Sequence, residues 1–263
     1  MLKIIAENLQ PFEKKAKLIF EGNQEALINF LHEIEAKGAT SIDVNLGPIR
    51  KNKKDVVKFF LQNIEKFSNL EIFLDSADPE VIKYGLEFAT KKIVINGFSL
   101  EERKLKEILP LAAYYKVDIV GLIMTGSFIP STLEEKLLLA EEMIYHAEQN
   151  GIDRSQIILD PVVIPLGWEN GTISAKSNIE FIKHLPSMFG PEIRTIVGLS
   201  NLTTKAAGGK AKEFFQSIYL SMLYDAGLSM VMLDIFNETI MSAIKFIDTL
   251  EGKRIFSFAE FSS

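Results

Sequence analysis

The sequence has 263 residues, of which 47% are hydrophobic and 24% are charged, and its formal net charge is -6. Its length is enough to bury about three quarters of the unfolded surface in one core, and the absence of cysteine excludes disulfides, zinc thiolates and iron–sulfur ligation. The acidic balance argues against nucleic-acid binding. No signal peptide or membrane-spanning run is recognisable, so we expect a cytoplasmic protein that binds no membrane.

Short apolar runs alternate with amphipathic stretches along the whole chain. The expected strands cover residues 3–6, 41–45, 72–75, 93–96, 118–124, 157–160, 196–201 and 230–233. The expected helices cover residues 24–37, 55–67, a segment from 78, 99–115, 131–150, 175–185, a segment through 225–227, and 239–250. Helix starts are marked by Asn23, by Asp78-Pro79, by a capping box at Ser99-Leu100-Glu101-Glu102 and by Ser131-Thr132.

Eight strand–helix units with short connections predict a parallel sheet that closes as a (β/α)8 barrel, with residues 1–263 as one domain. The competing fold is an open doubly wound sheet. That fold usually carries a glycine-rich phosphate loop after its first strand, whereas this sequence has Glu7-Asn8-Leu9-Gln10 there. We therefore expect the barrel, with a small-residue loop over 202–210 beside its mouth.

Four apolar strands end on polar residues, at Asp75, at Asn96, at Asp160 and at Gly198-Leu199-Ser200-Asn201. In a parallel barrel these strand ends converge on one mouth. Carboxylates accept hydrogen bonds and amides both donate and accept them, which suits the amino-amide edge of a flat heterocycle. The alternative interpretation is local: Asp75 could cap the next helix, Asn96 and Asp160 could form turns, and Asn201 could only terminate its strand.

Five motifs, one at each of five strand ends, resemble the pterin-binding methyltransferase family, with a barrel like that of dihydropteroate synthase. They are Asp43-Val44-Asn45, Leu74-Asp75-Ser76, Ile95-Asn96, Asp160-Pro161 and Gly198-Leu199-Ser200-Asn201. The family includes the methyltetrahydrofolate:corrinoid (iron–sulfur) protein methyltransferases and the folate module of cobalamin-dependent methionine synthase. The resemblance implies that Asp75, Asn96 and Asp160 hold the pterin. It also implies a catalytic Asn201 at folate N5, with further pterin contacts from Asn45, Met124, Gly198 and Ser200.

The sequence also departs from the family pattern. The first strand of family members usually ends in Glu-Arg, where this chain has Glu7-Asn8, and an arginine often follows the Ser-Asn motif. Here Lys205 or Lys210 could contact the folate glutamate tail, although plain solvation is the favoured interpretation of both. Trp168 could anchor a partner protein or pack within its own loop.

Three hypotheses for the function remain to be distinguished. The leading hypothesis is methyl transfer between N5 of tetrahydrofolate and the cobalt of a separate corrinoid protein, by a homodimer without a metal of its own. The chain lacks the Asp-x-His-x-x-Gly pattern of corrinoid-binding modules, so the corrinoid must come on that partner. Dihydropteroate synthase is a rival, but its Ser-Arg-Lys motif and its Arg and His on the eighth strand are missing at Leu199-Ser200-Asn201 and Leu233-Asp234-Ile235-Phe236. A non-catalytic folate-binding protein is the other alternative.

Overall fold

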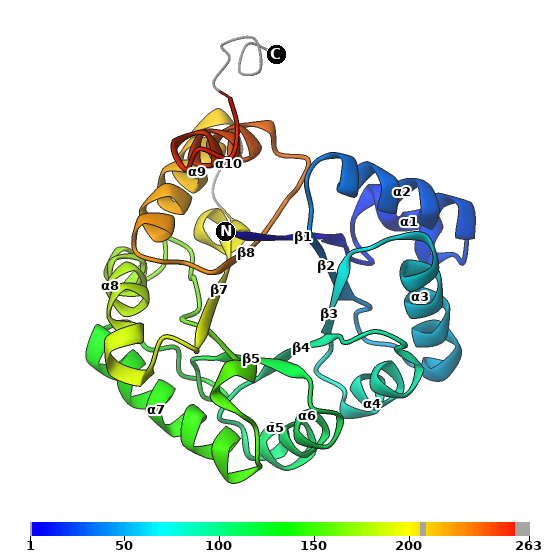
Figure 1. Cartoon of the computed structure of the whole chain (residues 1–263), viewed down its shortest axis with the longest axis horizontal. Coiled ribbons are helices and arrows are strands. Elements are labelled where there is room, and N and C mark those ends of the chain that lie inside the picture. The colour runs from blue at the N-terminus through cyan, green and yellow to red at the C-terminus, as the bar shows by residue number, and fades with distance from the viewer. Residues whose placement is uncertain (1, 206–208, 256–263) are drawn as a thin grey trace.

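The computed structural model describes residues 2–205 and 209–255, which form a closed barrel of eight parallel strands (Figure 1). Each strand pairs with the next along the chain, and β8 closes the barrel on β1. The strands are β1 (Lys3–Leu9), β2 (Ser41–Asn45), β3 (Glu71–Asp75), β4 (Val94–Phe98), β5 (Asp118–Leu122), β6 (Ile157–Asp160), β7 (Arg194–Gly198) and β8 (Met230–Leu233). The predicted (β/α)8 architecture is thereby confirmed.

Helices surround the barrel (Figure 1). They are α1 (Lys17–Phe20), α2 (Gln24–Ala36), α3 (Lys53–Phe67), α4 (Pro79–Phe88), α5 (Glu102–Glu107), α6 (Leu109–Tyr115), α7 (Leu133–Gln149), α8 (Gly171–Phe189), α9 (Lys210–Asp225) and α10 (Glu238–Leu250), with 3-10 turns η1 (Lys14–Ala16), η2 (Arg154–Gln156) and η3 (Leu199–Thr203). The predicted caps at Asn23, Asp78 and Thr132 are observed, and Thr132 forms a full capping box with Glu135. No helix in the described part of the chain is long and apolar enough to cross a membrane.

The helix expected over residues 99–115 is two helices, and the capping box expected at its start is wrong. Ser99 donates its hydroxyl to the Glu101 carboxylate at 2.8 Å instead of capping a backbone N–H, and α5 starts without a side-chain cap. The break between α5 and α6 precedes Pro110, which has no N–H to donate to the preceding turn.

Three boundaries near the mouth also differ from the prediction. The polar segment Glu7-Asn8-Leu9 belongs to β1 and was expected to be a loop. β5 ends at Leu122, two residues before the expected end at Met124, and β7 ends at Gly198, after which the chain turns into η3. The small-residue loop expected over 202–210 is described only in part, because residues 206–208 lie outside the described residues.

The alternation of strand side chains divides each strand between the barrel interior and the helix layer. One buried cluster fills the interior, with Ile5, Phe73, Val94, Val120, Ile158, Ile196 and Met230. A second, larger cluster packs the outer faces of the strands against the helices. Because strand side chains alternate between the two faces, the residue two positions after each member of this interior cluster also points inward. These residues form the next layer, closer to the carboxyl ends of the strands.

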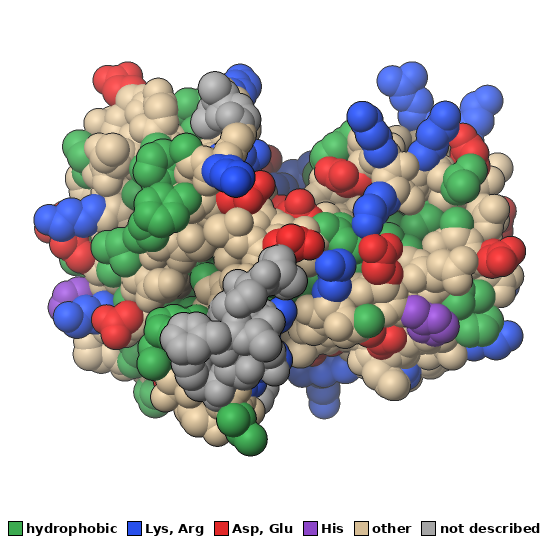
Figure 2. All heavy atoms as spheres, turned by 90° about the horizontal axis from the view of Figure 1, so that it is seen from above, with side chains coloured by type: hydrophobic (Ala, Val, Ile, Leu, Met, Phe, Trp, Pro, Cys, Tyr) green, Lys and Arg blue, Asp and Glu red, His purple; other side chains and the backbone are tan. Residues whose placement is uncertain are grey.

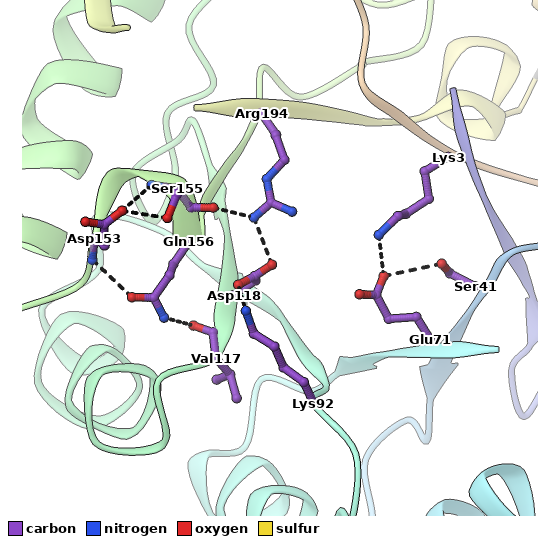
Figure 3. A network of polar contacts seen from close by, with 10 residues as sticks. All are labelled: Lys3, Ser41, Glu71, Lys92, Val117, Asp118, Asp153, Ser155, Gln156 and Arg194. Atoms are coloured by element: carbon purple, nitrogen blue, oxygen red, sulfur yellow. Dashed lines mark hydrogen bonds and ion pairs between the residues drawn. The ribbon is translucent and has the colours of Figure 1, made fainter. Parts of the chain in front are cut away.

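The two ends of the barrel differ in character. Figure 2 shows the molecule at right angles to the view of Figure 1. Its upper edge in this view is hollowed, and acidic side chains lie near the hollow. At the opposite end, ion pairs join the first residues of several strands (Figure 3). Asp118 pairs with Lys92 and with Arg194, the latter at 2.8 Å, and Lys3 pairs with Glu71 at 2.7 Å. These contacts tie strands together at the end remote from the hollow, where barrels carry stabilising rather than catalytic residues.

Candidate functional site

A cavity of about 630 Å³ lies at the carboxyl ends of the strands. Its walls are the inward positions one layer above the interior cluster, and they are predominantly polar. They include Glu7 of β1, Asp43 and Asn45 of β2, Asp75 of β3, Asn96 of β4, Leu122 of β5, Asp160 of β6, Gly198 of β7 and Met232 of β8. Every strand of the barrel therefore contributes to one site, because each strand ends with its inward side chain at the mouth.

Two amide–carboxylate pairs fix the β2–β4 side of the cavity. Asn45 donates through Nδ2 to Asp75 at 2.7 Å, and its Oδ1 accepts from the backbone N–H of Gly47 at 3.0 Å. Asn96 donates through Nδ2 to Asp43 at 3.0 Å. Since the donor atom of Asn96 is engaged, its Oδ1 is left as an acceptor toward the cavity. Both pairs hold acceptor groups in place before any ligand arrives.

Asp160 is held by its own turn, and the charge of a buried lysine acts on it. One carboxylate oxygen accepts from the backbone N–H of Val162 at 2.8 Å, and Val162 has a φ of 60°, which β-branched residues rarely adopt. Behind this turn, the ammonium of Lys136 donates to the carbonyls of Pro130 and Pro161 at 2.8 Å each. Lys136 is fully buried. It therefore connects the loop after β5 to the residue that follows Asp160.

Burial dominates the ionisation of the acids in this cavity. It raises the pKa of Asp160 to about 7, against the lowering influence of the Val162 N–H and of Lys136. It raises the pKa of Asp75 to about 6, with Lys104 and Asn45 acting in the opposite direction. The pKa of Asp43 is also raised, first by burial and then by the charge of Asp75. Burial lowers the pKa of Lys136 to about 8, although Asp160 acts to raise it. Carboxylates that are costly to keep ionised gain most from a ligand that brings N–H donors.

The end of β7 presents a serine and an asparagine together. Ser200 donates its hydroxyl to Glu7 at 3.1 Å. Asn201 lines the cavity, and its side-chain amide forms no hydrogen bond to any other described residue. A Cβ at position 198 would lie 3.1 Å from Asn201 Nδ2, so glycine leaves room for this amide. Asn201 is thus an unengaged donor and acceptor at the mouth.

The structure brings most of the residues singled out in the sequence into this one cavity. Lining it are Asp75, Asn96, Asp160, Gly198, Ser200, Asn201 and Asn45. Met124, Lys205, Lys210 and Trp168 are not among the described residues that line it, and Trp168 is 50% exposed on the loop before α8. The capping interpretation of Asp75 is wrong, since Asp78 caps α4, whereas Asp160 does form the turn considered for it.

Sequence reasoning missed several residues of the cavity wall: Glu7, Asp43, Lys212 and Asp234. Two of them carried a usable signal, because Asp43 lies two residues before Asn45 and Glu7 lies two residues after the buried Ile5, on the same side of their strands. Asn8 also lines the cavity, and it donates to Asp234 at 2.7 Å and accepts from the Ile235 N–H at 3.0 Å. Among the described residues, no cluster of histidine and carboxylate side chains is arranged to hold a metal ion.

Relatives of known activity resemble the chain along most of its length. A methylcorrinoid:tetrahydrofolate methyltransferase from Eubacterium limosum is 27% identical over 253 residues, which cover 95% of this chain and 91% of that protein. The methionine synthase of Mycobacterium leprae (strain TN) is 27% identical over 199 residues, which cover 73% of this chain but 16% of that protein.

Solved structures with the same fold include dihydropteroate synthases. That of Xanthomonas albilineans in complex with 7,8-dihydropteroate has a TM-score of 0.68 at 16% identity, covering 95% of this chain and 93% of that chain. The Yersinia pestis enzyme with a pterine-sulfa conjugate has a TM-score of 0.69 at 15% identity, covering 95% and 94%. At such identities the likeness shows that the fold is shared and carries no information on activity.

The family model described as pterin binding enzyme matches residues 7–234. The match begins at Glu7 and ends at Asp234, two residues that line the cavity from opposite ends of the chain. It therefore takes in the end of β1 and all of β2 to β8, and on this match the chain belongs to the family of pterin-binding enzymes.

Proposed function

We propose that this protein is a methyltransferase that moves a methyl group between N5 of tetrahydrofolate and the cobalt of a corrinoid carried by a separate protein. The observation that carries the proposal is the unengaged amide of Asn201 beside a ring of fixed acceptors. The relative from Eubacterium limosum, whose name states this chemistry, supports it. The proposal also takes the protein to be a cytoplasmic homodimer whose interface leaves the mouth free.

The acceptors of the cavity match the donors of a reduced pterin. The 2-amino group, N3–H and N8–H of the ring all donate hydrogen bonds. Asp75, Asp160 and the Oδ1 of Asn96 are the acceptors that would receive them, each already held by a partner in the protein. A ligand without these donors would leave buried acceptors unsatisfied, at a cost of about 1–3 kcal/mol each. This cost gives selectivity for the pterin edge.

Asn201 acts at the reacting nitrogen. An amine nitrogen is a poor leaving group, so N5 must gain positive character as the methyl group departs. The Asn201 amide can donate to N5 when N5 is unprotonated and accept through Oδ1 when N5 carries a proton. An oriented neutral group of this kind stabilises the transition state without repelling a protonated ring. The corrinoid cobalt donates or accepts the methyl group from the open side of the mouth, because the interior cluster closes the other end.

The charge of the cavity separates this activity from dihydropteroate synthesis. That reaction releases pyrophosphate, an anion that calls for several cationic groups. Lys212 is the only lysine or arginine among the described residues that line the cavity, whereas its acids include Glu7, Asp43, Asp75 and Asp160. An acidic cavity suits a donor-rich ring and disfavours a diphosphate leaving group.

The test is single-turnover methyl transfer from methyltetrahydrofolate to a panel of corrinoid proteins, chosen first from those encoded by neighbouring genes. We expect transfer with at least one of them. Asn201→Ala should slow the transfer by about 10²–10³-fold, as for other oriented donors, and should change the dissociation constant for methyltetrahydrofolate much less. Asn69→Ala, on an exposed loop at the remote end of the barrel, is the matched control. Tight folate binding without transfer to any corrinoid protein would favour the non-catalytic folate-binding protein instead.

A further inference from the structure

Glu7 is a partly buried carboxyl for which the proposed mechanism has no role. It lies on β1, lines the cavity, and accepts the Ser200 hydroxyl at 3.1 Å. Ser200 belongs to η3, the same short turn that presents Asn201, and both residues line the cavity. The contact therefore connects a carboxyl on the first strand to the residue adjacent to the amide proposed to act at N5.

The reaction itself moves a proton, which a nearby acid–base group could accept and return. Transfer of a methyl group to tetrahydrofolate replaces the N5–H bond with an N5–C bond and releases one proton, and the reverse reaction consumes one. Most other acids of the cavity have partners or proposed roles already: Asp75 and Asp160 would face the pterin donors, Asp43 accepts from Asn96, and Asp234 accepts from Asn8. Glu7 differs because it accepts from Ser200, the residue next to the amide proposed to act at N5.

We propose that Glu7 takes the N5 proton when a methyl group arrives and returns it when the methyl group leaves, with the Ser200 hydroxyl as the link. The proposal rests on the methyltransferase function argued above. In the first direction the N5 lone pair forms the bond to the methyl carbon, and the electron pair of the broken Co–C bond stays on cobalt, which changes from Co(III) to Co(I). The N5–H bond breaks, its proton passes to Ser200 Oγ, and the Ser200 proton passes to Glu7. The reverse direction retraces these transfers.

The surroundings of Glu7 suit a group that must both accept and release a proton. Burial raises the pKa of Glu7 to about 7, and the Ser200 hydrogen bond acts against this increase. Among the neighbouring charges, Asp234 and Glu13 raise the pKa and Lys212 lowers it, and Glu7 in turn raises the pKa of Asp43. A carboxyl that titrates near the working pH is the most effective in general acid–base catalysis.

A purely structural role for Glu7 would be to hold η3 against β1. The two roles differ in their response to Glu7→Gln, because glutamine keeps the length of the side chain and still accepts from Ser200, but cannot exchange the proton. A structural role predicts a variant that behaves like the wild type. A proton-transfer role predicts slower transfer with an altered pH profile, since general acid–base groups contribute about 10²–10⁴-fold.

The experiment is single-turnover methyl transfer between pH 5.5 and 9 for the wild type, Glu7→Gln, Ser200→Ala and Ser200→Thr. We expect the wild-type rate to change around pH 7. In Glu7→Gln and Ser200→Ala this change should disappear and the rate should fall at least 10-fold, while Ser200→Thr, which keeps the hydroxyl, should restore it. Affinity for methyltetrahydrofolate, measured by calorimetry, should stay within about 3-fold. Glu141→Gln, an exposed glutamate on α7, is the matched control.

A rate within 3-fold of the wild type and an unchanged pH profile in Glu7→Gln would overturn the proposal. If Glu7→Gln does not fold, the same two outcomes in Ser200→Ala decide the question. A second readout does not depend on turnover: the ¹³C NMR signal of the Glu7 carboxyl carbon should titrate near pH 7. The signal is identified in labelled protein by its absence from the Glu7→Gln spectrum, or it is assigned through the backbone of Glu7. Titration near pH 4 would also overturn the proposal. Failure of the methyltransferase function itself would appear separately, as absence of transfer by the wild type.

Discussion

Asp160→Asn is expected to make the protein more stable while weakening its affinity for folate. A pKa of about 7 in place of the ordinary 3.8 means that the ionised carboxylate costs the folded state about 4 kcal/mol. Asparagine has the same shape, and its Oδ1 can still accept from the Val162 N–H. Part of the gain is offset because Lys136 loses the charge that faces it. We therefore expect a net gain of about 1–3 kcal/mol at pH 8.

The pH dependence gives this prediction its sign. Between about pH 4 and pH 7 the folded protein holds a proton on Asp160 that the unfolded chain has lost, so the free energy of unfolding decreases as the pH rises through that window. Below pH 4 the carboxyl is neutral in both states and contributes no cost. The stabilisation of Asp160→Asn should therefore be near zero at pH 4 and largest above pH 7.

Two measurements test both halves of the prediction. Urea unfolding between pH 5 and pH 8 gives the stability difference, with Asp55→Asn, an exposed aspartate on α3, as the control. Calorimetry with methyltetrahydrofolate should show binding weakened by about 1–3 kcal/mol, because an amide donor would face a ring N–H. An Asp160→Asn protein that is less stable than the wild type at pH 8, or that binds folate equally well, would refute the reasoning.

Two further predictions follow from residues outside the cavity wall. Lys136→Met removes the positive charge that favours the ionised form of Asp160, so the pH below which methyltetrahydrofolate binding weakens should move upward; calorimetry across pH would show it, and an unmoved midpoint would contradict the coupling. Trp168→Ala, at a half-exposed position on the loop after β6, should raise the KM for the corrinoid protein while the folate dissociation constant is kept; an unchanged KM in steady-state kinetics would place the docking surface elsewhere.

The fold and much of the site could be predicted from the sequence because both depend on periodicity. Eight apolar runs separated by amphipathic helices left few alternatives to a barrel, and polar residues such as Asp75 and Asp160 stood out because they follow buried positions directly. The same polarity led to the wrong assignment of Glu7-Asn8 to a loop. Inward-facing polar residues at a barrel mouth have the composition of a loop, and only the pairing of β1 with its neighbours shows them to be strand.

Lys136 could not be recognised in the same way. It lies on an amphipathic helix, where a lysine is ordinarily solvated, and its burial depends on loops that converge from two different strands. Local patterns carry no information on that convergence. The division of residues 99–115 into α5 and α6 could have been predicted from Pro110. The helical pattern of apolar residues continues on both sides of this proline, and so the sequence was interpreted as one helix.

The two-residue repeat that places the polar layer above the apolar interior also limits how such a site can change in evolution. Deleting one residue of β3 ahead of Leu74 would turn Asp75 toward the helices and turn Leu74, which now packs outward, into the barrel interior, so a single deletion removes a binding group from the mouth. Substitutions, in contrast, alter one wall of the cavity at a time. We therefore expect relatives of this protein to differ by replacements at strand ends and by insertions in the loops beyond them, with strand lengths kept. The Glu7-Asn8 pair, where family members usually have Glu-Arg, is a replacement of this kind.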